Sequence, residues 1–320
     1  MYIPIYIKKY NIYDIYHNDN NNLIIISPME NNILNIKYGD NNFTTHICSH
    51  NHTFVYILDI ETIYIKNIKL SINEEILETN VNKYPEFKNE IIMSTIILNE
   101  DDYIKQWINF HLNIGITRFI IYDNSSNNTL ENILKYFINN NIVILIKWNY
   151  NYSLPNSGSS GQTTQQNHSI WAFKNSKYIG LFDIDEYINM QNNYQNIDIF
   201  FNDLIINEKI NIENTGGFQL LNKLFFNPYN LPTNDYEFLK IYNCDNILLV
   251  GREKLFVIPK NVYTYSIHCI TKGKNSYNVS HEKIFFNHYI FLNKSERGRN
   301  ITDITDITDN TISNHCTNLL

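Results

Sequence analysis

The sequence predicts an α/β protein with a doubly wound, mostly parallel, Rossmann-like sheet that follows a small β-rich region. Two observations carry this prediction: apolar β-branched runs alternate with segments of helical period between residues 91 and 182, and the connections between them are short. Such alternation is typical of parallel strands joined by helices in right-handed crossovers. We expect residues 1–88, 89–300 and 301–320 to form the β-rich region, the main domain and a low-complexity tail.

The first 88 residues are irregular at first and then resemble strands. Residues 53–58 (TFVYIL) and 62–72 (TIYIKNIKLSI) are rich in β-branched and aromatic side chains, which favour strands. Pro85 and the charged residues around it mark a junction. We find no catalytic or binding motif in this region, so its role stays open.

The main domain begins with a predicted strand and helix. Residues 91–98 (IIMSTIIL) form an apolar run of the kind that is buried on both faces of a sheet. Asp101 and Asp102 are suitable residues to begin the helix that follows, and Gly115 is suitable to end it. The side chains that recur on one face of this helix are Ile104, Trp107, Ile108, His111 and Leu112.

The same alternation continues to residue 182. Residues 118–122 (RFIIY), 142–148 (IVILIKW) and 178–182 (YIGLF) have the composition of buried strands. Residues 130–138 repeat the helical spacing, and residues 162–175 are expected to be helical. Because ligands of such sheets bind beyond the carboxyl ends of the strands, a binding site is expected among the loops at 99–101, 123–128, 149–161 and 183–186.

Two aspartates follow the last of these strands in the segment FDIDEY. Asp183 and Asp185 are separated by one residue, so both side chains can project from the strand end while Ile184 points toward the core. Carboxylate oxygens suit a hard cation such as Mn²⁺ or Mg²⁺, whose shell diphosphate oxygens and water would complete. The alternative is a chance pair that caps a helix. The preceding strand and the following Glu186 favour the metal site.

Polar residues also follow the first two strands. Asp123 and Asn124 begin the segment DNSS, which could hold a base or ribose, although Asp, Asn and Ser favour ordinary turns as well. Asn99 and Glu100 follow the first strand, where simple helix capping is the alternative.

Imidazole and basic groups lie later in the chain. His268 and His288 each follow an apolar or aromatic stretch, and each is either a metal ligand or a satisfied core residue. Basic residues that could contact a diphosphate, or simply face solvent, are Arg252, Lys254, Lys283, Lys294, Arg297 and Arg299.

The composition argues against several classes of function. The net charge is −7, with 25 basic against 32 acidic side chains and no basic cluster, so nucleic acid is not an expected partner. The four scattered cysteines lack the spacing of a zinc site and the density of a disulfide scaffold. The chain has no apolar run of the length that spans a membrane and no signal-peptide pattern. We therefore expect a soluble, cytoplasmic protein whose membrane association, if any, is peripheral.

Segments spread between residues 91 and 297 together resemble glycosyltransferase family 92 and the related family-2-like transferases, which have a GT-A fold. The opening, STIILNEDDYIKQWINFHLNIGITRFIIYDNSS, resembles the family's Asn-Glu, its helix with Trp and its strand into Tyr-Asp-Asn. The segment QQNHSIWAFKNSKYIGLFDIDEYI is similar to the family's Gln-x-x-x-His-type helix and metal-binding strand. The segments GREKLFVIPKNVYTYSIH and NHYIFLNKSE are similar to its later elements. Agreement of four elements in the right order is improbable by chance.

The resemblance implies a GT-A domain that transfers a hexose, often galactose, from a UDP-sugar to a hydroxyl of a glycan or glycoconjugate with inversion. It implies an Mn²⁺ or Mg²⁺ cofactor, for which the candidate ligands are Asp183, Asp185, His268 and His288. Candidates for contact with the nucleotide sugar are Asn99, Glu100, Asp123, Asn124, Asp183, Arg252 and Lys294.

The sequence departs from the family pattern on the acceptor side. Residues 216–230 read GGFQLLNKLFFNPYN and contain no acid, and the next acid is Asp235. The catalytic base is therefore not assigned, and the candidates are Asp235, Glu237, Asp245 and Glu282.

Two other functions remain open. A metal-dependent phosphotransferase or nucleotidyltransferase also uses carboxylates at strand ends, but 10 glycines leave little room for a Gly-rich phosphate loop. A carbohydrate-binding protein on a degenerate transferase fold would lack the base. The donor sugar, the acceptor and the linkage depend on the shape of loops that follow no sequence code.

Overall fold

The computed structural model describes most of the 320-residue chain. The described residues are 1–18, 22–28, 33–48, 53–60, 65–99, 102–126, 129–153, 160–227, 229, 231–234, 236–245, 248–292 and 307–316.

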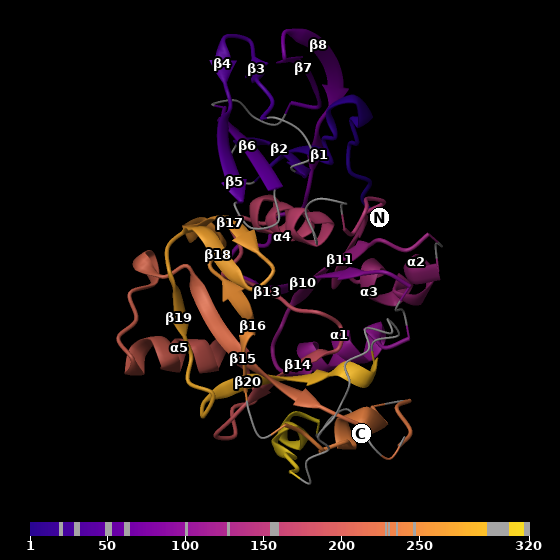
Figure 1. Ribbon diagram of the computed structural model, residues 1–320, viewed down its shortest axis with the longest axis vertical. Helices are drawn as coiled ribbons and strands as arrows, with labels where there is room; N and C mark the ends of the chain where they lie inside the picture. Colours follow the sequence, from indigo (N-terminus) through magenta and orange to yellow (C-terminus); the bar gives the residue numbers. More distant parts are fainter. Residues whose placement is uncertain are drawn as a thin grey trace.

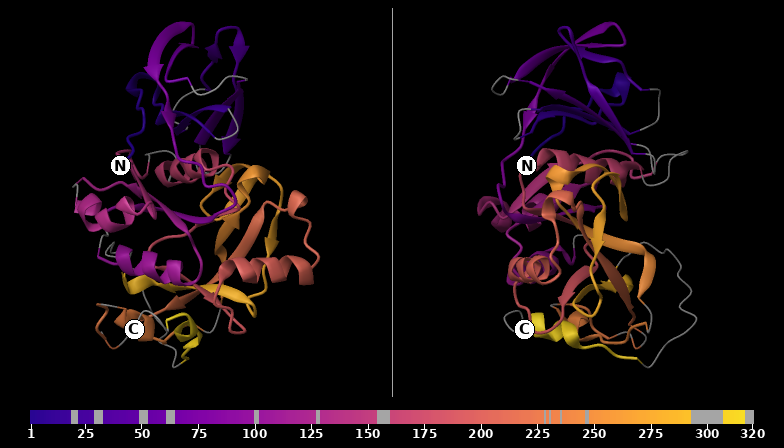
Figure 2. Two further views of the ribbon diagram at one scale, coloured as in Figure 1. Left: turned by 180° about the vertical axis from the view of Figure 1, so that it is seen from behind. Right: turned by 90° about the vertical axis from the view of Figure 1, so that its left-hand side faces the viewer.

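The residues before the main domain form two small sheets at one end of the long axis of the molecule (Figures 1 and 2). One sheet has the strand order β5-β6-β2-β1-β9 and the other β4-β3-β7-β8. The core of these two sheets consists of alternating apolar residues of the strands, among them Leu23, Ile25, Ile68, Leu70 and Ile72, which are all buried. The strands are β1 Asp14–His17, β2 Asn22–Pro28, β3 Ile36–Tyr38, β4 Asn41–Asn42, β5 Thr44–Cys48, β6 Thr53–Asp59, β7 Asn67–Ile72, β8 Glu75–Asn80 and β9 Asn82–Lys83.

The main domain is built on one large sheet with the strand order β12-β11-β10-β13-β16-β15-β20-β14, and β19 also pairs with β15. The four strands predicted from the sequence, β10 to β13, are confirmed and pair in parallel. The strands are β10 Ile91–Ile97, β11 Arg118–Asp123, β12 Val143–Lys147, β13 Tyr178–Leu181, β14 Glu186–Met190, β15 Gly217–Phe225, β16 Leu249–Val257, β19 Ser276–Asn278 and β20 Ile284–Tyr289; a separate hairpin consists of β17 Val262–Ser266 and β18 Cys269–Gly273.

The expectation of a mostly parallel sheet is wrong for the other half. There β13 pairs antiparallel with β16, β16 with β15, and β14 with β20, whereas β15 pairs in parallel with β20 and with β19, so this half is mixed. The reason lies in the turn after β13, where the Glu186 N–H donates to the Asp183 carbonyl oxygen at 3.2 Å. The chain continues from this turn into β14 without a crossover helix, and β14 pairs with β20 at the end of the strand order rather than with β13, so the strand–helix alternation ends here.

Helices cover both faces of the parallel strands. Residues 119 and 121 of β11 share a core with α1, α2, α3 and α5, whereas residues 120 and 122 share a core with α4 and the N-terminal region. The helix predicted over residues 130–138 is divided into two at Leu134. Gly115, with φ +96°, follows the first helix as predicted. The helices are α1 Ile104–Asn113, α2 Thr129–Ile133, α3 Lys135–Asn139, α4 Ser160–Ala172 and α5 Ile197–Asn207; the short 3-10 helices are η1 Lys8–Tyr10, η2 Ile212–Asn214, η3 Glu237–Lys240, η4 Pro259–Asn261, η5 Ile290–Leu292 and η6 Thr311–His315.

Helix α4 lies between the N-terminal sheets and the large sheet (Figure 1). Its polar side chains are buried, and the N-terminal region supplies partners for them. Asp14 and His168 are fully buried and bond at 3.0 Å between Oδ2 and Nε2. Tyr84 donates to the same Asp14 oxygen at 2.6 Å, and the Tyr122 hydroxyl bonds to the other His168 nitrogen at 2.7 Å. The N-terminal region is therefore part of the structural support of α4.

Residues 307–316 of the expected low-complexity tail form a bridge to Asn243 and the 3-10 helix η6. Ile312 and His315 are buried, and His315 Nε2 lies 3.0 Å from the backbone nitrogen of Met190 in β14. Asp309 also pairs with Lys223 at 2.6 Å. Of the described helices, none is long and apolar enough to span a bilayer.

Candidate functional site

A tight turn brings three carboxylates to the carboxyl end of β13. The Asp183 N–H donates to Oε2 of Glu186 at 2.8 Å, and the Glu186 N–H donates back to the Asp183 carbonyl oxygen. Asp185 lies between them, 5% exposed, and Glu186 is 2% exposed. Two of the three carboxyl groups are therefore buried at the edge where ligands of such sheets bind.

Strand β20 adds an imidazole to this cluster. His288 pairs with Glu186 in the antiparallel β14–β20 ladder, and the Tyr289 N–H donates to the Asp185 carbonyl oxygen at 2.9 Å. This register places His288 Nε2 3.2 Å from Oδ2 of Asp185. One ligand atom each from Asp185, Glu186 and His288 lies within 4.8 Å of the other two.

Lys254 of β16 contributes a buried ammonium group to the same place. Its Nζ lies 2.6 Å from Oδ2 of Asp183 and 3.2 Å from Oε2 of Glu186, and its side chain is 2% exposed. Burial lowers the pKa of Lys254, but the attraction of Asp183 and Glu186 outweighs it and holds that pKa above its ordinary value. Lys254 therefore stays charged and balances these carboxylates.

The ionisation of the other members follows from burial and charge. Burial raises the pKa of Glu186 to about 7, against the opposing effect of Lys254. Burial opposes ionisation of Asp183 too, but Lys254 outweighs it, so the pKa of Asp183 lies below its usual value. For His288, burial lowers the pKa and Asp185 raises it, and the net result is a raised pKa.

One further residue bonds to the cluster, and a second acts on it electrostatically. Gln162, in the first turn of α4, donates from Nε2 to Oδ1 of Asp183 at 3.4 Å. His268 is half-buried, and its pKa is lowered by burial and by Lys254 while Asp183 raises it. His268 Nδ1 lies 2.8 Å from the Glu253 carbonyl oxygen.

The predicted nucleotide-binding residues lie on neighbouring strand ends. Asp123 ends β11, is 1% exposed and pairs with Lys147 at 2.8 Å. The Asn124 amide side chain donates to the carbonyl oxygens of Trp148 and Tyr150. Asn99 follows β10, is exposed, and donates from its backbone N–H to Ser125 Oγ at 2.9 Å. Because β11, β10 and β13 are adjacent and parallel, these residues share one sheet edge with Asp183.

The remaining candidates are placed less centrally or lie outside the described residues. Arg252 is exposed on β16, and Glu237 pairs with Lys240 at 2.9 Å. The backbone N–H of Asp245 donates to the Leu224 carbonyl oxygen, and that of Glu282 donates to Ser280 Oγ at 3.3 Å. These contacts join none of the three acids to the Asp185 cluster. Glu100, Asp235 and Lys294 fall outside the described residues.

Sequence reasoning did not assign Glu186 or Gln162 to the site. Glu186 could have been found from its position next to Asp185, because it begins the strand that follows the turn. Gln162 gives no local signal, since it lies 21 residues before Asp183 in the chain. Lys254 was one of several basic candidates, and only the pairing of β16 with β13 separates it from the others.

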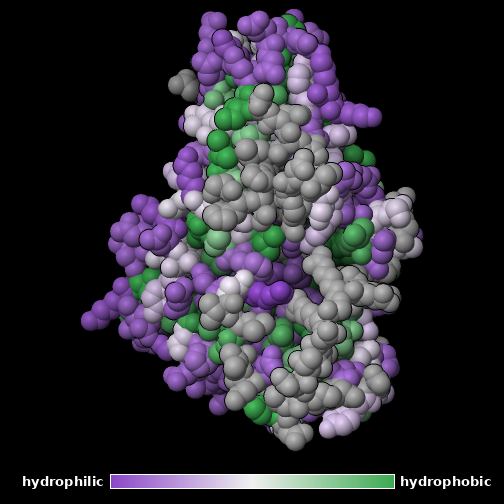
Figure 3. Space-filling view, in the orientation of Figure 1, coloured by the Kyte–Doolittle hydropathy of each residue, from purple (hydrophilic) through white to green (hydrophobic). Residues whose placement is uncertain are grey.

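One face of the molecule is polar at its centre. Hydrophilic side chains gather in the middle of the face seen in Figure 3, over the region where β13 and β16 lie in Figure 1, and apolar side chains border them.

Comparison with known proteins identifies relatives of this chain. The sequence model of glycosyltransferase family 92 matches residues 89–319. A family 92 protein of Oryza sativa subsp. japonica is 25% identical over 114 residues, which are 36% of this chain and 18% of that protein. One of Arabidopsis thaliana is 28% identical over 102 residues, 31% of this chain and 16% of that protein. The matched segments thus span less than a fifth of these relatives.

Solved structures show a partial overlap with the fold. Residues 1–349 of S. aureus TarS in complex with UDP have a TM-score of 0.31 and 17% identity, and the overlap covers 47% of this chain and 40% of that chain. A second TarS structure has a TM-score of 0.37 and 12% identity, with 64% of this chain and 37% of that chain covered.

Proposed function

This chain belongs to glycosyltransferase family 92, and from that premise we propose that it transfers a hexose from a UDP-sugar to a hydroxyl of a glycan or glycoconjugate. The observation that supports this proposal best is the convergence of Asp185, Glu186 and His288 within 4.8 Å at the carboxyl edge of the sheet. Asp183 and Lys254 border the same cluster.

The donor set fits a divalent cation. Asp185 and Glu186 offer carboxylate oxygens, and Mn²⁺ or Mg²⁺ prefers oxygen ligands but accepts an imidazole. His288 Nδ1 is buried and has no hydrogen-bond partner among the described residues, so part of the ring's bonding capacity is unused. In this proposal Asp185, Glu186 and His288 hold the cation and Asp183 borders it, and the cation would offset charge on the departing UDP.

The protein's own groups would then position the donor. Lys254 already carries a charge in a buried place, so a diphosphate oxygen that approaches Asp183 meets an ammonium group that needs little rearrangement. Gln162 orients the Asp183 carboxylate through the bond to Oδ1. Asn99, Asp123 and Asn124 lie along the neighbouring strand ends, where the nucleoside would extend.

Four acids are candidates for the catalytic base that takes the proton of the acceptor hydroxyl. They are Asp235, Glu237, Asp245 and Glu282, and replacement of each by its amide is the direct comparison. The base variant should lose transfer to the acceptor while it retains binding of UDP.

The test of the proposal is release of UDP from a panel of UDP-hexoses with Mn²⁺ or Mg²⁺. The double variant Asp183→Asn, Asp185→Asn should lose metal-dependent UDP release by at least about a hundredfold. Asp203→Asn on α5, where Asp203 accepts a hydrogen bond from Tyr194, is the matched control and should retain it. Retained turnover in the double variant would rule the assignment out.

The same preparation separates the rival functions through thermal stability. Stabilisation by UDP that requires Mn²⁺ supports the transferase, because only a ligand that binds the folded state raises its stability. Stabilisation by ATP instead would favour a phosphotransferase, and stabilisation by free glycans alone would favour a carbohydrate-binding protein.

A further inference from the structure

The turn of residues 123–125, which follows β11, is held in place by its neighbours. The Asp123 side chain is 2% exposed, and both of its oxygens are engaged. Oδ1 accepts from the Ser125 N–H at 3.0 Å, and Oδ2 accepts from Lys147 Nζ at 2.8 Å. Lys147 also donates to the Ser125 carbonyl oxygen at 2.9 Å. The Asp123 carboxylate is therefore occupied within the protein, where it orders the turn.

The segment after β12 holds the same turn from a second direction. The side-chain amide of Asn124 donates to the carbonyl oxygens of Trp148 and Tyr150. The backbone N–H of Asn124 donates to the Ile97 carbonyl oxygen in β10 at 2.8 Å. The position of the turn therefore depends on where Lys147 and Tyr150 are held.

The N-terminal region contacts both of these residues. Tyr2 pairs in parallel with the outer edge of β12. Its N–H donates to the Leu145 carbonyl oxygen at 2.8 Å, and the Lys147 N–H donates to the Tyr2 carbonyl oxygen at 2.9 Å. The Tyr13 ring stacks on Tyr150, with 3.7 Å between the centroids and 8° between the planes. The Tyr150 hydroxyl also donates to the Tyr13 carbonyl oxygen.

These contacts lie at the nucleoside end of the proposed donor site. In the strand order, β11 and β12 are two and three positions from β13, which is roughly 10 and 14 Å at about 4.8 Å per strand. A UDP whose diphosphate lies at the carboxylate cluster extends its nucleoside along this edge of the sheet. The N-terminal region therefore acts on the end of the site that is far from the bond to be broken.

We propose that the N-terminal region is part of the donor site and positions the turn of residues 123–125 for the nucleoside through Lys147 and Tyr150. This inference rests on the proposed function, and it gives a role to residues that precede the family match at 89–319. Lys147 and Tyr150 are positioning residues. A turn that is already ordered binds its ligand without a further ordering cost, so these residues set the affinity for the donor.

The test compares nucleotide affinity with turnover in the full chain. Lys147→Met leaves the Asp123 carboxylate without its cation, so the turn loses its order. The dissociation constants of UDP and of UMP, both with Mn²⁺, should rise by at least about tenfold, and KM for the active UDP-hexose should rise equally. At saturating donor, kcat should stay within about threefold, because the carboxylate cluster lies three strands away. If Lys147→Met does not fold, Asp123→Asn breaks the same ion pair and should give the same result.

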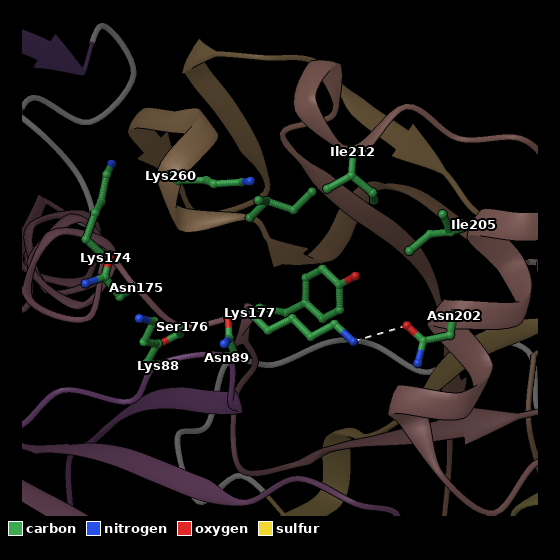
Figure 4. A pocket seen from close by; sticks show the side chains of 12 residues that line it. Lys88, Asn89, Lys174, Asn175, Ser176, Lys177, Asn202, Ile205, Ile212 and Lys260 are labelled. Carbon is green, nitrogen blue, oxygen red and sulfur yellow. Dashed lines mark hydrogen bonds between the residues drawn. The ribbon is translucent and has the colours of Figure 1, made fainter.

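Lys177→Met is the matched control. Lys177 pairs with Asp198 and donates to Asn202 at 3.1 Å (Figure 4), so it too bonds an aspartate and a second acceptor. It precedes β13 and lines a separate pocket at the amino end of that strand, opposite the donor site. Its replacement should leave the affinities for UDP and UMP unchanged.

The contribution of the N-terminal region itself is measured at Tyr13. Tyr13→Leu removes the ring that stacks on Tyr150 and should weaken binding of UDP and UMP by about threefold to tenfold. Tyr13→Phe keeps the ring and should retain the affinity of the wild type. If Tyr13→Leu does not fold, Tyr150→Phe removes only the bond to the Tyr13 carbonyl oxygen and should weaken binding by about threefold.

Several results would overturn the proposal. They are wild-type affinity in either Lys147→Met or Tyr13→Leu, an equal loss of affinity in Lys177→Met, and a fall in kcat with unchanged KM. A wild-type chain that binds no UDP with Mn²⁺ would overturn the proposed function together with this inference. If the wild type binds UDP and the variants bind it equally well, this inference alone has failed.

Discussion

Replacement of Lys254 by Met should expose how strongly the site depends on its buried ammonium group. The side chain is 2% exposed and lies 2.6 Å from Asp183 and 3.2 Å from Glu186. At an effective dielectric constant of about 20, the attractions to Asp183 and Glu186 are about 6 and about 5 kcal/mol. The desolvation of Lys254 opposes both, and the Asp183 contact is discounted because that carboxylate is 42% exposed to screening solvent. Removal of one partner from a buried pair commonly costs about 3–5 kcal/mol, and we expect the lower end.

The assay is urea unfolding at pH 7, followed by fluorescence of the three tryptophans, which are all buried. Lys260→Met is the control, because its pair with Glu213 is exposed and should contribute less than about 1 kcal/mol. The double variant Lys254→Met, Glu186→Gln should recover part of the lost stability, because it no longer contains the buried Glu186 carboxylate that Lys254→Met leaves without its cationic partner. A Lys254→Met variant as stable as Lys260→Met would refute the reasoning.

Two further predictions concern buried ionisable groups outside the site. Burial lowers the pKa of Lys174 to about 7 from 10.5, so between these values the unfolded chain holds a proton that the folded chain has lost. The free energy of unfolding should therefore rise between pH 7 and pH 10, by up to about 4 kcal/mol relative to the Lys174→Met variant. Chemical denaturation at each pH measures this. If the free energies of unfolding of the two proteins change in parallel with pH, Lys174 is not a buried uncharged lysine. Asp14→Ala should destabilise the protein by about 3–5 kcal/mol, because His168 and Tyr84 lose their buried acceptor. A denaturation midpoint equal to that of the wild type would show that Asp14 does not stabilise the fold through these bonds.

The parallel half of the sheet could be predicted because its signals are local. Each of β10 to β13 is a short apolar run followed by a polar turn, and such a run is recognisable without knowledge of its neighbours. The same locality gave the correct position of Asp183 and Asp185 at a strand end. The mixed half was missed because its pairings join distant parts of the chain. In the β14–β20 pair, Glu186 and His288 are about 100 residues apart, a separation that leaves no periodic signature.

The site shows the same division between local and distant contacts. Asp185 and Glu186 are neighbours in sequence, whereas Lys254 lies 71 residues from Asp183 and His288 lies 103 residues from Asp185. The sequence offered several lysines as diphosphate contacts and two histidines as metal ligands without a reason to choose among them. Only the strand order shows that Lys254 lies in the site, whereas Lys283 pairs with Glu208.

The role of the N-terminal region could not be read from the sequence for a related reason. Asp14 resembles any acidic residue at a strand end, but its partner His168 is 154 residues away on α4. Helix α4 carries polar residues on every face, and a polar helix is stable in the interior only if its side chains find partners. Asp14 supplies one from the N-terminal side, while Gln165 bonds to Ser94 of the large sheet at 2.9 Å. Because Gln162 on the same helix contacts Asp183, the N-terminal sheets support the position of the carboxylate cluster through α4.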